Sequence, residues 1–175
     1  MLRTSSAPDD TRRHARRVRQ LAALIAAALD LPAAEVAMIR RDAPLHDVGK
    51  RQIPEAVLLK PGPLTDAEWE LMKSHATVGA KVLSYRRSGI MRMVERIALS
   101  HHERLDGSGY PEGFAGDQIT LCARIVAVAD VFDALSSERP YRAAWPEPDV
   151  VAEIQRGRGT HFDPAVVDAF LSQYR

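Results

Sequence analysis

The stretch LCARIVAVADVFDALS at residues 121–136 decides the fold class of this chain. It is apolar almost all round, and a helix with apolar residues on every side has to be surrounded by other elements. Residues 121–136 are therefore predicted to form the buried central helix. Two carboxylates interrupt the apolar pattern, at Asp130 and Asp133.

Helical periodicity also dominates the rest of the chain, and no segment alternates convincingly at period two. The Thr65-x-x-Glu68 capping box opens one predicted helix, which is expected to break near His75, and Pro44 is expected to kink the last turn of another. The sequence predicts an all-α fold, a compact single-domain bundle of about six to eight helices over residues 1–175. Besides 121–136, helices are predicted at about 10–29, 32–47, 65–84, 90–102, 148–156 and 164–173, with connections at 53–64 and 103–119.

Composition excludes several classes of protein. The chain is 46% hydrophobic and 27% charged with a formal net charge of +1, so it offers no global electrostatic case for binding DNA or an anionic membrane. The basic N-terminal stretch is interpreted as the solvated face of a helix, and it comprises Arg12, Arg13, Arg16, Arg17 and Arg19. Cys122 is the single cysteine, which excludes an internal disulfide or a thiolate cluster, and we expect it to pack as a small hydrophobe. A single cysteine that forms no disulfide fits a reducing, cytoplasmic location.

The apolar run at residues 21–29 follows the basic stretch as it would in a signal peptide. It is too short to span a bilayer, and Val18, Ala22 and Ile25 follow helical spacing. We interpret it as the apolar face of a core helix.

Asp130 points to a metal. An unpaired ionised carboxylate among apolar neighbours costs several kcal/mol, so it must have a partner. A divalent cation is one such partner, and a buried salt bridge or a helix cap is the alternative, although no cationic residue lies within one turn. Asp133, one turn later, would either share the site or hydrogen-bond its ligands.

The histidines strengthen this interpretation. His101 and His102 directly precede a glycine-bracketed turn, and His46-Asp47 is expected to close the helix 32–47, which Gly49 would terminate. The two oxygens of an aspartate can bridge two metals. His14 and His75 add two further imidazoles, whereas His161 offers only a surface or cap position. Such mixed nitrogen and oxygen ligands suit iron, manganese or another first-row metal, and their number implies two metals or more.

The chain resembles the HD-GYP domains, a branch of the HD phosphohydrolase superfamily, over about residues 9–170. The matching segments follow the family's order. They are Pro44-Leu-His-Asp-Val-Gly-Lys50, Ile53-Pro54, Lys60-Pro-Gly-Pro-Leu-Thr65, His101 to Pro111, Ala127 to Leu135, Arg139-Pro-Tyr-Arg142 and Gly159-Thr-His-Phe-Asp-Pro164.

The resemblance implies a metal-dependent phosphodiesterase that hydrolyses cyclic di-GMP to pGpG, GMP or both through a metal-bridging hydroxide. Its cofactors would be two or three divalent ions, with iron or manganese expected. Asp47, as the bridging ligand, and Lys50, near the scissile phosphate, would be catalytic. The implied metal ligands are His14, His46, Asp47, His75, His101, His102 and Asp130.

The resemblance also assigns substrate contacts. Tyr110 would contact a guanine or a phosphate, and Arg139 and Arg142 would grip the nucleotide. Asp10 occupies the position where some members of the family have a glutamate that binds a third metal. The sequence therefore does not decide whether the site holds two metals or three.

Two alternatives remain. One is an HD phosphohydrolase that acts on another cyclic nucleotide or on a nucleoside phosphate, and the other is a catalytically silent module that recruits a signalling partner. No sensor or receiver domain is recognised in the sequence, so regulation is expected from a parent protein or from a partner such as a diguanylate cyclase or a receiver-type protein. The sequence does not indicate an oligomeric state.

Overall fold

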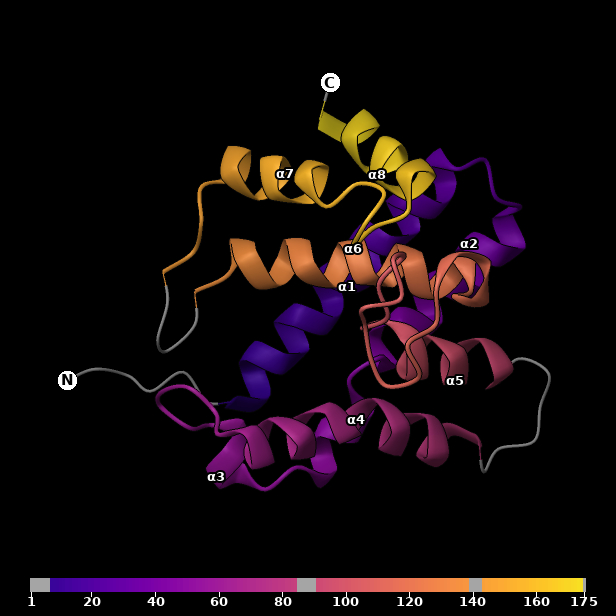
Figure 1. The fold of residues 1–175 in the computed structure, drawn as a ribbon. Helices are drawn as coiled ribbons and strands as arrows, with labels where there is room; N and C mark the ends of the chain where they lie inside the picture. The colour runs from indigo at the N-terminus through magenta and orange to yellow at the C-terminus, as the bar shows by residue number, and fades with distance from the viewer. Residues whose placement is uncertain (1–6, 85–90, 139–142, 175) are drawn as a thin grey trace.

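The structure is a computed structural model that describes residues 7–84, 91–138 and 143–174, with side chains described from residue 12 to 173 of these except at position 91. Eight α-helices and no strand occur in the described part, which confirms the all-α prediction (Figure 1). The α-helices are α1 (Ala7–Ala28), α2 (Ala33–Asp42), α3 (Glu55–Leu58), α4 (Asp66–Ser84), α5 (Met91–Ser100), α6 (Leu121–Ser136), α7 (Glu147–Arg156) and α8 (Pro164–Leu171). Three short 3-10 helices lie between them, η1 (Ala43–Leu45), η2 (Val48–Gln52) and η3 (Gly116–Gln118), and a fourth, η4 (Ser172–Tyr174), follows α8.

Helix α6 is the centre of the molecule, as predicted from its apolar sequence. It crosses the middle of Figure 1, with α7 and α8 on one side and α4 and α5 on the other. It packs directly against α1, α5, α7 and α8. Ile125, Val126, Val128 and Ala129 have no exposed surface, so this helix holds the core together.

Helix α1 contributes the other half of the main core. Val18, Ala22 and Ile25 are fully buried against α2, α6 and α8, which confirms the amphipathic interpretation of this segment. A smaller cluster of Leu83, Val94 and Ala98 packs α4 on α5. Within the described ranges, none of the helices combines the length and the hydropathy that a bilayer crossing requires.

Two predicted helix ends were wrong, and both concern the site. Helix α2 ends at Asp42 rather than at residue 47, because Pro44 does not kink the helix but replaces its continuation with η1. His46-Asp47 therefore lies in the turn between η1 and η2. Helix α5 ends at Ser100, so His101 and His102 lie in the turn after it.

The helix that begins after Thr65 was predicted correctly at its start. The Thr65 amide donates to Glu68 Oε2 at 2.7 Å, and the Glu68 amide donates back to Thr65 Oγ1 at 3.3 Å, which is a capping box. The expected break near His75 was wrong, since α4 is continuous from Asp66 to Ser84. The expected connection at 53–64 contains the short helix α3.

The remaining sequence expectations concern single side chains. Cys122 is partly buried and packs against the main core, as predicted. The arginines of the basic stretch in α1 are exposed, which agrees with a solvated helix face.

Candidate metal centre

Three elements bring a first group of ligand atoms together. His14 lies on α1, His46 in the turn after η1, and Asp130 on α6, and each offers one ligand atom within 4.8 Å of the others. The Nε2 atoms of His14 and His46 are 3.3 Å apart. Asp130 Oδ1 lies 3.4 Å from His14 Nε2 and 3.6 Å from His46 Nε2.

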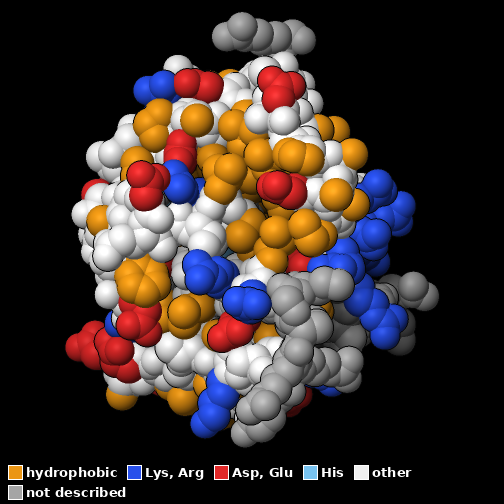
Figure 2. All heavy atoms as spheres, turned by 90° about the vertical axis from the view of Figure 1, so that its right-hand side faces the viewer, with side chains coloured by type: hydrophobic (Ala, Val, Ile, Leu, Met, Phe, Trp, Pro, Cys, Tyr) orange, Lys and Arg blue, Asp and Glu red, His pale blue; other side chains and the backbone are white. Residues whose placement is uncertain are grey.

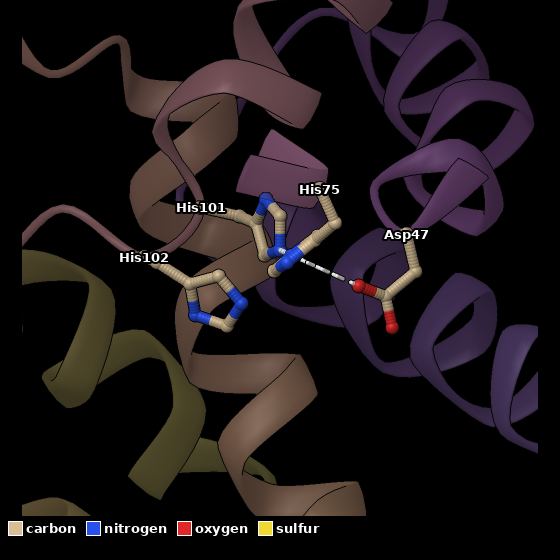
Figure 3. A group of neighbouring side chains, drawn as sticks. All are labelled: Asp47, His75, His101 and His102. Atoms are coloured by element: carbon tan, nitrogen blue, oxygen red, sulfur yellow. Dashed lines mark hydrogen bonds and ion pairs between the residues drawn. The ribbon is translucent and has the colours of Figure 1, made fainter. Parts of the chain in front are cut away.

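A second group consists of Asp47, His75, His101 and His102 (Figure 3). His75 comes from α4, and the two adjacent histidines come from the turn after α5. The Nε2 atoms of His75 and His101 are 3.4 Å apart. In Figure 3 the imidazoles converge from one side and the Asp47 carboxylate approaches from the other.

Asp47 lies between the two groups. Its Oδ1 is 3.4 Å from His75 Nε2 and 3.7 Å from His101 Nε2. Its Oδ2 is 3.3 Å from His46 Nε2 and 3.9 Å from His14 Nε2. Each oxygen therefore faces a different histidine pair, which is the geometry that a bridging carboxylate requires.

Backbone carbonyls orient three of the imidazoles. The Nδ1 atoms of His46 and His75 lie 2.8 and 2.7 Å from the carbonyl oxygens of Ala43 and Met72. His101 Nδ1 lies 3.1 Å from the Ile97 carbonyl. A ring that donates from Nδ1 presents the lone pair of Nε2, so these rings are set to bind a metal through Nε2.

This donor set fits divalent metal ions. Asp47 Oδ1 is buried and has no hydrogen-bond partner, although it faces two Nε2 atoms. Lone pairs of nitrogen and oxygen pointed at one another repel unless a cation or a proton lies between them. A divalent metal ion is one partner that satisfies buried groups of this kind.

In the first group, a proton on His46 can balance the nearby carboxylates when no cation does. Burial lowers the pKa of His46, but the charges of Asp47 and Asp130 and hydrogen bonds to them outweigh burial and raise the pKa to about 10. Burial instead lowers the pKa of His75 to about 4 and holds the pKa of His102 well below its usual range. His75 and His102 are thus neutral at pH 7 and ready to bind a metal.

Three residues of the centre are shielded from solvent, whereas His14, Asp47, His102 and Asp130 stay partly exposed. His46, His75 and His101 are 0%, 1% and 2% exposed. On the face shown in Figure 2, Lys and Arg side chains lie beside apolar ones, and no histidine of the described residues is visible. Low exposure strengthens electrostatic interactions at the centre because water screens them less.

Sequence reasoning left the role of Asp133 open, and the structure decides it. Asp133 Oδ2 lies 2.7 Å from His14 Nδ1, so this carboxylate orients a histidine of the first group rather than sharing the group. The Arg17 guanidinium, also on α1, forms an ion pair with the same carboxylate. Arg17 was missed as part of the site, and its position one turn after His14 on α1 was the available signal.

Gly49 explains why the turn containing His46 and Asp47 can approach α4. A Cβ atom at Gly49 would lie 2.0 Å from the carbonyl oxygen of His75 and 2.7 Å from the amide nitrogen of Gly79. Only a residue without a side chain fits there. Gly49 was expected to terminate a helix, but it lies within η2 and allows backbone contact.

The loop after His102 covers the second group. The Tyr110 ring stacks on His102 with centroids 4.8 Å apart and an interplanar angle of 27°. Gly109 packs against the backbone of residues 102–104, where a Cβ atom would lie 2.4 Å from the Arg104 nitrogen. Burial raises the pKa of Tyr110, so its phenol stays protonated and can donate a hydrogen bond.

Glu103 anchors this loop and was also missed. Its side chain is buried, and Oε1 accepts a hydrogen bond from the Glu112 amide at 2.8 Å. Burial raises the pKa of Glu103, whereas the backbone amides of Glu112, Gly113 and Phe114 oppose that increase. A carboxylate adjacent to a predicted ligand histidine was the available signal.

Four residues named in the sequence analysis remain, and three of them have no described side chain. Arg139 and Arg142 fall outside the described residues. Asp10 belongs to α1, four residues before His14, and its side chain is not described. His161 is half-buried, stacks on Phe162 and belongs to neither group.

Comparisons with known proteins identify the family of this chain. The sequence matches the HD-domain family over residues 4–166. The chain belongs to the HD-domain family. This HD domain is also similar to solved structures such as Bd1817, an HDG"Y"P protein from Bdellovibrio bacteriovorus, with a TM-score of 0.72 at 18% identity, covering 92% of this chain and 51% of that one. At this identity the likeness concerns the fold.

Curated relatives are more similar in sequence. The HD domain is 51% identical over 155 residues to the cyclic di-GMP phosphodiesterase response regulator RpfG of Xanthomonas campestris pv. campestris, covering 89% of this chain and 41% of the relative. It is 39% identical over 165 residues to the 3'3'-cGAMP-specific phosphodiesterase 2 of Vibrio cholerae, covering 94% of this chain and 32% of the relative. The chain thus spans less than half the length of these relatives. The matches confirm the assignment to the HD-GYP branch.

Proposed function

We propose that this HD domain is a metal-dependent phosphodiesterase that hydrolyses cyclic di-GMP to pGpG, GMP or both. One observation carries the proposal, namely that the two oxygens of Asp47 face two separate pairs of histidine Nε2 atoms. The 51% identity to a cyclic di-GMP phosphodiesterase supports the choice of substrate. The single-domain organisation and a cytoplasmic location stay predictions.

The proposed cofactors are two divalent ions, iron or manganese, with Asp10 as the candidate ligand of a third. His14, His46 and Asp130 would hold one ion, and His75, His101 and His102 the other, with Asp47 between them. Ions in such a pair lower the pKa of water and accept charge from phosphate oxygens. The imidazole and carboxylate ligands, with no thiolate among them, favour iron or manganese over a structural zinc site.

The chain's own side chains have separate roles in the proposal. Lys50 Nζ lies 2.6 Å from Asp47 Oδ2, so its ammonium group is held at the edge of the centre, where it can offset charge on phosphoryl oxygens. Tyr110, stacked on His102, can donate its phenolic hydrogen to a phosphate or a base. Arg139 and Arg142 stay proposed nucleotide contacts.

A second substrate is favoured by one observation, the 39% identity to a cGAMP-specific phosphodiesterase. Competition between cyclic di-GMP and 3'3'-cGAMP at equal concentrations would rank the two substrates. A catalytically silent binding module is disfavoured because all seven residues proposed as metal ligands are present in the two groups. A diguanylate cyclase or a receiver-type protein as regulatory partner stays a prediction.

The test is turnover by anaerobically purified protein whose metal content is measured. With iron or manganese, wild-type protein should convert cyclic di-GMP to a linear product, and Asp47→Ala should reduce the rate by about 100-fold or more. Asp168→Asn, which changes an exposed carboxylate on α8, is the matched control and should keep the rate. No turnover with either metal under reducing conditions would overturn the proposal.

A further inference from the structure

Trp69 is a large aromatic residue on the same helix as His75, and the mechanism above does not use it. It lies six residues before His75 on α4, and 46% of it is exposed. A single exposed tryptophan is not unusual. Its neighbours give it significance.

Trp69 completes a series of ring contacts that begins at the second ligand group. Tyr110 stacks on His102, with centroids 4.8 Å apart. The rings of Trp69 and Tyr110 meet in a T-shaped arrangement, with centroids 6.0 Å apart and an interplanar angle of 77°. The aromatic series His102, Tyr110 and Trp69 therefore leads from the metal centre to an indole that is still half uncovered.

A positive charge accompanies this series. Lys73, one turn after Trp69 on α4, places Nζ 5.9 Å from the centroid of the Tyr110 ring. Glu70 holds that ammonium group at 2.8 Å. An aromatic surface beside a cation suits a ligand that is both flat and anionic, and nucleotides have both properties.

We propose that Trp69 forms a stacking subsite for one purine base of the cyclic dinucleotide, an inference that rests on the proposed function. A phosphate at the metal centre joins its base through a ribose, so the base extends outward from His102 toward Trp69. Because 46% of Trp69 is exposed, part of the indole is available to contact a base. Trp69 would thus contribute to substrate affinity and not to metal binding.

Steady-state kinetics of the metal-loaded enzyme test the subsite. Trp69→Ala should raise KM for cyclic di-GMP by about tenfold, the scale of one lost base–aromatic stack, while kcat changes by less than about twofold. Trp69→Phe should restore most of the affinity because it keeps an aromatic face. Leu71→Ala is the matched control, since it truncates another exposed apolar side chain of α4 and should leave KM unchanged.

Fluorescence gives a second readout that does not depend on turnover. The chain has two tryptophans, Trp69 and Trp145, so Trp145→Phe leaves Trp69 as the only indole. In that variant, cyclic di-GMP should quench the emission within the mixing phase of a stopped-flow experiment. Trp69→Phe, in which Trp145 is the only indole, should show no such change.

The outcomes separate the subsite from the activity. An unchanged KM in Trp69→Ala, with an active wild type, would overturn the subsite alone. Loss of bound metal in Trp69→Ala would also overturn it, because Trp69 would then act only by supporting the centre. A wild type that does not turn over cyclic di-GMP would overturn the proposed function, whereas quenching of Trp69 by cyclic di-GMP in that protein would still support the subsite.

Discussion

Asp133 Oδ2 and His14 Nδ1 are 2.7 Å apart, and this contact joins the central helix α6 to His14 of the first group. The carboxylate fixes the ring so that Nε2 faces His46 and Asp130. The proposed ligand His14 on α1 is thereby held by a side chain of the central helix.

Replacing Asp133 with Asn should therefore weaken metal binding in the first group. We expect about a 10- to 100-fold loss of affinity, because the amide carries no charge to stabilise the His14 ring as a ligand. Titration against a metal-chelating dye, with atomic absorption for stoichiometry, measures this. Asp168→Asn serves as the control, and equal affinities of the two variants would contradict the prediction.

Metal loading should release a proton from His46. Because Asp47 and Asp130 raise the pKa of His46 to about 10, the ring is protonated at pH 7 in the metal-free protein and must lose that proton to bind. The apparent affinity should thus fall about tenfold for each pH unit below neutral. Isothermal titration in two buffers of different ionisation enthalpy would count the protons, and a count of zero would contradict the assignment.

The same pKa sets a stability dependence for the metal-free protein. A raised pKa in the folded state means that protonated His46 stabilises folding fully below its unfolded pKa of about 6.5, and that this contribution is lost as the pH rises through about 10. Urea unfolding at pH 7 and pH 10 should show a smaller drop in His46→Gln than in wild type. An equal drop in both would argue against the shift.

Removing the metals should lower the thermal stability. Ligands that bind only the folded protein stabilise it by about 2.7 kcal/mol at 100 times Kd, and in a domain of this size that corresponds to about 5–10 °C in Tm. Differential scanning calorimetry with and without a chelator measures the change. Asp47→Ala should show little response to the chelator, and a full response would mean that the metals bind elsewhere.

Truncating Glu103 should loosen the loop that carries Tyr110. Glu103→Ala leaves the Glu112 amide without its acceptor, and we expect a loss of about 2–3 kcal/mol in the free energy of unfolding. Glu103→Gln keeps one acceptor oxygen and should lose less. Urea denaturation ranks the variants, and equal losses would indicate that packing rather than the hydrogen bond holds the loop.

The sequence alone determined the helical class and predicted the residues that form the two groups. The apolar pattern at residues 121–136 requires a helix surrounded by others, and a carboxylate there requires a partner. The capping box at Thr65 was predictable because its hydrogen bonds join residues close in sequence. The helix ends near Pro44 and His101 could not be predicted in the same way. They depend on how the backbone packs against segments distant in sequence.

The tertiary structure decided how the ligand residues combine. Asp47 faces one histidine pair with each oxygen only because Gly49 lets its turn contact α4, and that contact joins segments distant in sequence. The pairing of Asp133 with His14, across 119 positions of the chain, likewise follows from the packing of α6 on α1. Residue types and periodicity are local properties of the sequence, whereas the direction in which a carboxylate points is set by the packing of the whole bundle.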